Sequence, residues 1–145
     1  MANKQAAANS KYFAKDFFVY QIGPLASLAP AASLPGNVTL DADSDFLWQK
    51  FNVFATTGND GATQATQVVP ALTITIKDTS SGRDLMNAAV PLPALAGSGQ
   101  LPFILPTAKI FQARGTIAVN VANISDNETY TGIYLAFVGT KLFLK

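Results

Sequence analysis

The stretch Leu72-Thr73-Ile74-Thr75-Ile76-Lys77 alternates apolar and polar side chains, the period of two expected of a half-buried β-strand. Residues 116–122, Thr-Ile-Ala-Val-Asn-Val-Ala, alternate in the same way. Because successive side chains of a strand point to opposite faces, one face of each segment packs inward. The side chains predicted to face the core are those of Ile74, Ile76, Ile117, Val119 and Val121.

Further strands are predicted on either side of these two segments. Residues 17–22 read as a first strand, and residues 130–144 are largely apolar on both faces. Residues 46–54 are predicted to place Phe46, Trp48 and Phe54 on one face. Their other face then carries Leu47, Phe51 and Val53. The prolines at 91, 93, 102 and 106 are expected to bracket short edge-like segments around Leu92 and Phe103-Ile104-Leu105. No convincing helical period follows residue 37.

The number and spacing of these segments predict the fold class. Seven or eight short strands without βαβ alternation indicate an all-β sandwich or barrel. A jelly-roll-like β-sandwich is preferred, because the spacing is uneven and a long connection such as 55–71 could cross between sheets. An immunoglobulin-like sandwich stays open, although the chain lacks the Cys…Trp…Cys signature.

The first part of the chain differs from the rest in composition. Residues 2–15 are rich in Ala, Asn and Lys without sustained apolar periodicity, and prolines 24, 30 and 35 follow. Proline has no N–H to donate and disfavours a central strand. We therefore predict an extended N-terminal arm and Pro/Ala-rich linker over residues 1–36, contributing little to the fold, and a β-sandwich domain over residues 37–145.

Composition excludes several classes of protein. The 145 residues carry 10 Lys and Arg against 9 Asp and Glu, a net charge of +1, so the basic surplus of a nucleic-acid binder is missing. Without His or Cys, the chain cannot form a Ser-His-Asp triad, a thiolate nucleophile or a Cys/His zinc site. The N-terminus lacks the apolar core of a signal peptide, and no apolar run reaches the ~20 residues that span a bilayer. We expect synthesis in the cytoplasm, no nucleic-acid or membrane partner, and no enzymatic activity.

One polar cluster suggests a metal site. Asp41, Asp43 and Asp45 could present oxygens to Ca²⁺. The calcium-loop pattern fails, however, because Phe46 stands where glycine is needed and Asn52 where a bidentate Glu is needed. A solvent-facing or interface turn is therefore predicted, with no catalytic, cofactor-binding or metal-binding residues and no cofactor.

Three other functional roles compete with ordinary structural ones. A pair among the eight Asp and one Glu could hydrolyse a glycosidic bond, but no spacing singles out a pair. Trp48, Tyr130 and Tyr134 could form a sugar-stacking platform, although core packing of these rings is the stronger expectation. Gly97-Ser98-Gly99 is too short to cradle a phosphate and lacks the following Lys.

Several short stretches, in order, carry a family resemblance. They are Thr73-Ile74-Thr75-Ile76-Lys77-Asp78, Ser81-Gly82-Arg83, Val90-Pro91-Leu92, Leu105-Pro106, Gly115-Thr116-Ile117 and the ending Tyr134-Leu135-Ala136-Phe137-Val138-Gly139-Thr140-Lys141. Over residues 37–141 the chain resembles capsid cement or head-decoration proteins of tailed bacteriophages.

The resemblance implies a function and partners. It implies a virion protein that binds the outer capsid surface and stabilises the shell, with the major capsid protein as partner and a dimer or trimer as its own assembly. It implies no catalytic residues. The alternatives are a tail or baseplate component and a carbohydrate-binding β-sandwich module.

Overall fold

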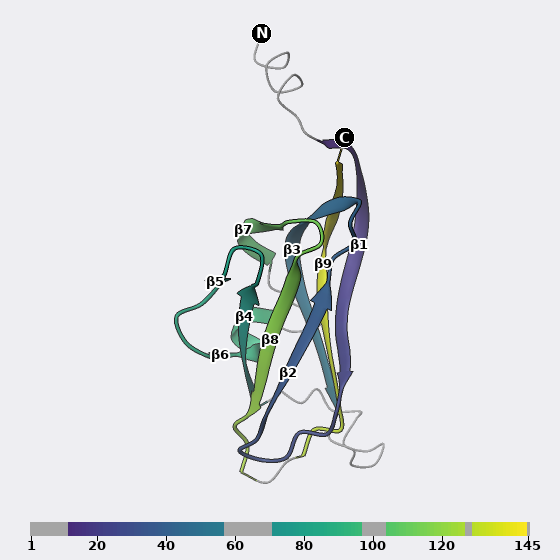
Figure 1. Ribbon diagram of the computed structural model, residues 1–145. Helices are drawn as coiled ribbons and strands as arrows, with labels where there is room; N and C mark the ends of the chain where they lie inside the picture. Colours follow the sequence, from purple (N-terminus) through teal and green to yellow (C-terminus); the bar gives the residue numbers. More distant parts are fainter. Residues whose placement is uncertain (1–11, 57–70, 97–103, 127–128, 145) are drawn as a thin grey trace.

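The structure is a computed structural model that describes residues 12–56, 71–96, 104–126 and 129–144 (Figure 1). It is a sandwich of two antiparallel sheets, which confirms the predicted all-β class. The first sheet has the order β1-β9-β3-β7, with bounds Tyr12–Leu25, Gly132–Leu144, Ser44–Thr56 and Ile104–Phe111. The second has the order β2-β8-β4-β5, with bounds Ser33–Thr39, Thr116–Asn123, Leu72–Asp78 and Arg83–Asp84; β6 (Val90–Pro91) also pairs with β4.

The path of the chain gives a jelly roll. The long strands β1, β2, β3 and β4 alternate between the two sheets, and β7, β8 and β9 do the same on the way back. As a result β9 lies between β1 and β3, and β8 lies between β2 and β4 (Figure 1). This double Greek key is the arrangement of jelly-roll sandwiches, and it decides against the immunoglobulin-like alternative.

The core lies between the two sheets. All five side chains predicted to face inward from β4 and β8 are at most 4% exposed, which confirms the alternation in those strands. Aromatic rings from the first sheet complete the core, with Trp48 in ring contact with Phe51, Phe111 and Phe137. Tyr20 also meets Phe46 edge to face. The strand β9 is apolar on both faces, as predicted, because it lies inside its sheet with β1 and β3 on either side.

A β-bulge overturns the faces predicted for residues 46–54. Trp48 pairs with Gly139 and Lys50 pairs with Val138, so Gln49 is an extra residue in β3. An extra residue reverses the alternation beyond it. Phe51 is therefore fully buried on the side of Trp48, whereas Phe54 is 59% exposed on the opposite face. The Trp48 indole N–H donates to the carbonyl oxygen of Lys50 at 2.8 Å and closes the bulge.

The predicted arm over residues 1–36 is wrong for its described part. The strand β1 pairs with β9 along its length and buries Tyr20 and Ile22, and β2 pairs with β8. The three prolines are compatible with this because Pro24 lies near the end of β1, Pro30 lies between strands, and Pro35 lies in an edge strand. The domain therefore includes residues 12–36, and the remaining arm residues, 1–11, lie outside the described residues.

The prediction of edge-like segments around Leu92 is also wrong in part. Leu92–Ala96 forms a short helix, α3, and buries Leu92 and Ala96 against the core. Pro91 precedes its first turn, where the missing N–H costs no helical hydrogen bond.

Candidate functional site

The three carboxylates considered as calcium ligands, those of Asp41, Asp43 and Asp45, do not form one group. Asp45 is buried and accepts hydrogen bonds from the Ala113 backbone N–H at 2.8 Å and from the Tyr12 hydroxyl at 2.9 Å. Asp41 instead accepts from the Lys141 ammonium at 2.6 Å. Within the described residues no group of three or more His, Cys, Asp or Glu side chains is placed to hold a metal ion. Asp41 thus links the turn before β3 to β9. Asp45, near the start of β3, links this strand to β1 and to the backbone after β7.

Lys141 is the cation that fixes this turn. It is 7% exposed, and its ammonium lies 4.0 Å from the centroid of the Phe18 ring. Burial by itself lowers the pKa of Lys141, but the hydrogen bond to Asp41 and the nearby negative charges outweigh it and raise the pKa above 10.5. The ammonium thus stays charged and binds the 41–43 turn to β9.

A second ionic cluster closes the turn after β4. Asp78 is 3% exposed and accepts hydrogen bonds from the hydroxyls of Ser80 at 2.7 Å and Ser81 at 3.1 Å. The Lys109 ammonium lies 3.2 Å from the same carboxylate. Burial raises the pKa of Asp78, but these hydrogen bonds lower it below 3.8 overall. The contacts with Ser80, Ser81 and Lys109 hold the turn after β4 in place.

The sugar-stacking platform, the weaker of the two roles considered for Trp48, Tyr130 and Tyr134, is also not formed. Trp48 and Tyr130 are at most 3% exposed, and the Tyr130 hydroxyl accepts the Ala71 N–H at 2.8 Å. Tyr134 lies on the outer face of β9 instead, with its ring 5.8 Å from that of Phe54. Because two of the three rings belong to the core, they cannot stack on a sugar.

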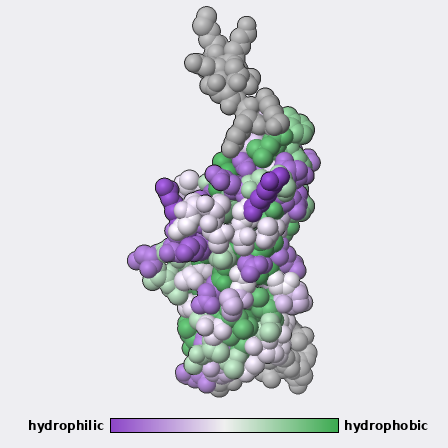
Figure 2. Space-filling view, in the orientation of Figure 1, coloured by the Kyte–Doolittle hydropathy of each residue, from purple (hydrophilic) through white to green (hydrophobic). Residues whose placement is uncertain are grey.

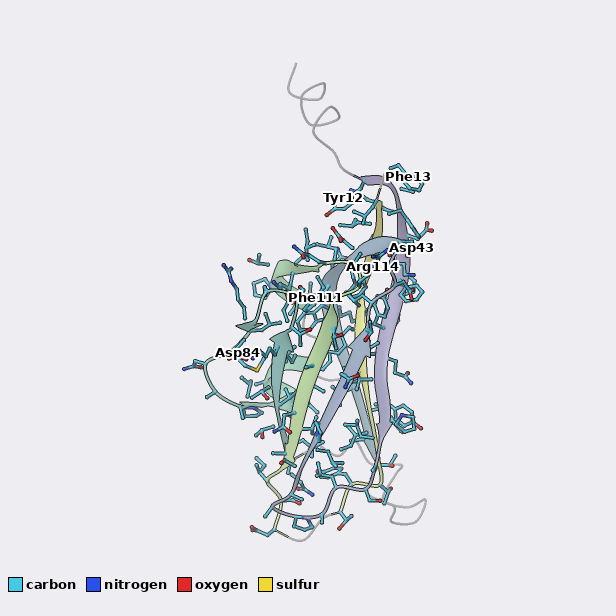
Figure 3. All side chains as sticks on the ribbon, in the orientation of Figure 1. Tyr12, Phe13, Asp43, Asp84, Phe111 and Arg114 are labelled. Atoms are coloured by element: carbon cyan, nitrogen blue, oxygen red, sulfur yellow. The ribbon has the colours of Figure 1, made fainter. Side chains whose placement is uncertain are left out.

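A different feature stands out on the outside of the first sheet. Among the described residues, six of the seven exposed large hydrophobic side chains belong to its strands, the seventh being Ile124 after β8. We call the outward side of the β1-β9-β3-β7 sheet the apolar face. Its exposed members are Phe17, Val19, Phe54, Ile104 and Ile110. Phe13 lies at the bulge that begins β1 and projects at the end of the sandwich (Figure 3).

The strand register arranges the apolar face in rows. One row crosses all four strands through Phe17, Thr140, Leu47 and Ile110. The next row crosses through Val19, Val138, Lys50 and Ile104. Four strands about 4.8 Å apart and about ten residues long give the whole outward side of the sheet an area of roughly 600 Å². The exposed apolar side chains share this area with polar ones such as Thr140 and Lys50. Apolar patches of a few hundred Å² on a monomer are often functional.

Sequence reasoning did not find this face. The consecutive aromatic pair Phe17-Phe18 was a usable signal, because two adjacent strand residues cannot both point inward. The contribution of Phe54 was hidden by the bulge at Gln49. The rows themselves depend on which strands are neighbours, and that is a property of the topology.

Comparison with known proteins adds no relative. No protein-family model matches the chain, and no curated protein matches it. Among the described residues there is no helix with the length and apolar character needed to cross a membrane.

Proposed function

We propose that this protein is a structural virion protein without catalytic activity, a cement or decoration protein that binds the outer surface of a bacteriophage capsid. The observation that carries the proposal is the apolar face, whose rows run across four strands with side chains such as Phe17 at 75% and Ile104 at 68% exposure. The jelly-roll fold and the resemblance of residues 37–141 to decoration proteins agree with it.

The mechanism is burial of apolar surface against the major capsid protein. Covering one exposed Phe or Ile contributes up to about 1.5–3 kcal/mol, because apolar surface leaves water. A rigid sheet loses little conformational entropy on docking, so more of this gain is kept as affinity. Repeated at many positions of the shell, the contacts would hold neighbouring subunits together without any chemical step.

The described polar clusters support a structural role. Asp45, Asp78 and Lys141 each have partners that hold turns in place. Trp48 and Tyr130, two of the three rings that would stack on a sugar, are buried in the core. This leaves the carbohydrate-binding alternative without its platform.

The test is cosedimentation with purified capsid shells that lack the protein. We expect the wild-type chain to pellet with shells and the Ile104→Ser variant to pellet at least tenfold more weakly. Thr75→Ser, on the outer face of the second sheet, is the matched control and should bind like wild type. No retention on shells would overturn the proposal, and retention on purified tails alone would favour a tail or baseplate component.

A further inference from the structure

Within the part of the chain that the structure describes, the sandwich has four sheet edges, and only one of them has a long, uninterrupted run of pairing that contains no proline. The edge strand β2 contains Pro35, β7 contains Pro106, and β5 has two residues. Prolines and short strands are devices that keep an edge from pairing with another chain. The fourth edge is β1, whose register with β9 runs unbroken from Ala14 to Ile22.

The backbone groups that β1 presents at this edge can be identified from the ladder. The Leu144 N–H donates to the carbonyl of Asp43, the residue directly before β3. The backbone groups of even-numbered residues of β9 therefore face β3, and those of odd-numbered residues face β1. Since Phe18 pairs with Gly139, the even-numbered residues of β1 bond to β9. The N–H and C=O groups of its odd-numbered residues therefore point to the free edge. Those residues are Lys15, Phe17, Val19 and Gln21, all exposed, and no hydrogen bond is found for their backbone groups among the described residues.

We propose that a second copy of this chain pairs with this edge, β1 against β1 in antiparallel fashion about a two-fold axis. An antiparallel strand is its own complement, because each free N–H then faces a free C=O of the same pattern. The two sheets join into one, and the apolar face continues from one copy to the other. This dimer does not depend on the proposed function, because it would form in solution without capsid shells.

Charge excludes two positions for the two-fold axis. Pairing centred on Lys15 or Asp16 would put a charge directly opposite itself, which destabilises a strand pair. Centred on Phe17 or Phe18, the pairing avoids this. Either register places Phe17 opposite Phe17 or Val19 of the second copy, and aromatic pairs of this kind stabilise sheets.

The size of the contact predicts its strength. Nine paired residues span about 30 Å, and a sheet edge with its side chains is about 10 Å deep, so the pair buries roughly 600 Å² in total. This is below the ~1,000 Å² of a stable interface. We therefore expect a dimer that dissociates on dilution. Docking of both copies on one surface would then strengthen binding through effective concentration.

Single cysteines test the geometry, because the chain has none of its own. Phe17→Cys is treated with a short bismaleimide, with Lys77→Cys, exposed on the outer face of β4, as the matched control. We expect covalent dimers from Phe17→Cys and at least tenfold fewer from Lys77→Cys. Equal yields from the two variants, or none from Phe17→Cys, would overturn the proposal.

Sedimentation velocity over a concentration series gives the second readout. The wild type should approach twice its 15.3 kDa mass at high concentration, and Val19→Lys should stay monomeric while keeping its circular dichroism spectrum. Thr75→Lys adds the same charge to the other sheet and should dimerise like wild type. A wild type that stays monomeric, or a Val19→Lys variant that dimerises equally well, contradicts the pairing. Because no shells are present, such a failure leaves the capsid proposal untouched.

Discussion

The two sheets bury similar side chains inward but differ in what they present outward. The second sheet shows small and polar residues on its outer side: Ser33, Pro35, Asn37 and Thr39 from β2, Thr116, Ala118, Asn120 and Ala122 from β8, and Thr73, Thr75 and Lys77 from β4. Figure 2, with β2 and β8 in front as in Figure 1, shows near-neutral and hydrophilic colours across much of this side. The first sheet shows the apolar face.

This difference teaches that the two outer faces differ in hydropathy and not in charge, since both carry few charged side chains. Threonine and asparagine suffice to keep one sheet hydrated, so few charged residues are needed there. On the apolar face, Lys15 and Lys50 are the charged side chains at outward positions besides Asp45, whose carboxylate is hydrogen-bonded and buried. A surface that is apolar and nearly free of carboxylates is suited to contact with another protein surface.

The largest predicted effect comes from comparing a side chain in the core with one on the apolar face. Ile117→Ala removes a fully buried side chain and should lower the free energy of unfolding by about 2–5 kcal/mol, because it leaves a cavity. Phe17→Ala removes a larger side chain from the apolar face and should change it by no more than about 0.5 kcal/mol. Urea denaturation measures both. If Phe17→Ala costs as much as Ile117→Ala, then Phe17 is packed and the apolar face is misplaced.

The next effect compares the two outer faces in binding. Phe54→Ser combined with Ile104→Ser should weaken binding to shells by roughly 100-fold, since each loses at least about 1.4 kcal/mol of apolar burial. The control with the same number of changes on the second sheet, Thr73→Ser with Thr75→Ser, should bind within about twofold of wild type. Equal losses from both pairs would show that the comparison of the two faces does not predict binding.

A smaller effect concerns Asp78 at the end of β4, whose contribution to the stability of the fold depends on pH. The folded pKa of Asp78 lies below 3.8, so its contribution to stability is present above that pH and is lost as the pH falls through the lower folded value. Asp78→Asn should cost roughly 1.5–3 kcal/mol near pH 7, the range for hydrogen bonds to a charged group. The cost should shrink as the pH falls below 3.8 toward the lower folded pKa. A cost that stays constant from pH 7 down into strong acid would mean that the carboxylate charge is not what holds the turn.

The sequence could predict the second sheet better than the first. β4 and β8 pair without a bulge, so Ile74, Ile76, Ile117 and Val121 keep a strict alternation that a reader of the sequence can follow. In β3 the alternation changes at Gln49, because the Trp48 indole closes a bulge that depends on the pairing with β9. No local pattern at that position reveals it.

The strand β1 could not be assigned to the domain for a related reason. Its inward residues Phe18, Tyr20 and Ile22 are interleaved with Phe17 and Val19, so the polar half of the usual alternation is missing. The apolar face escapes prediction for the same reason, because a strand without polar side chains on its outer side lacks the alternation by which it is recognised in a sequence. What made β1 hard to place is also what gives its sheet an apolar outer face.

The measurement that tests the central claim most directly is maleimide labelling of single cysteines with and without capsid shells. Phe54→Cys reports on the apolar face, and Lys77→Cys reports on the outer face of the second sheet, in a chain with no other cysteine. We predict that shells slow the labelling of Phe54→Cys at least tenfold and leave that of Lys77→Cys unchanged. Slowing at Lys77→Cys with free access to Phe54→Cys would contradict the account.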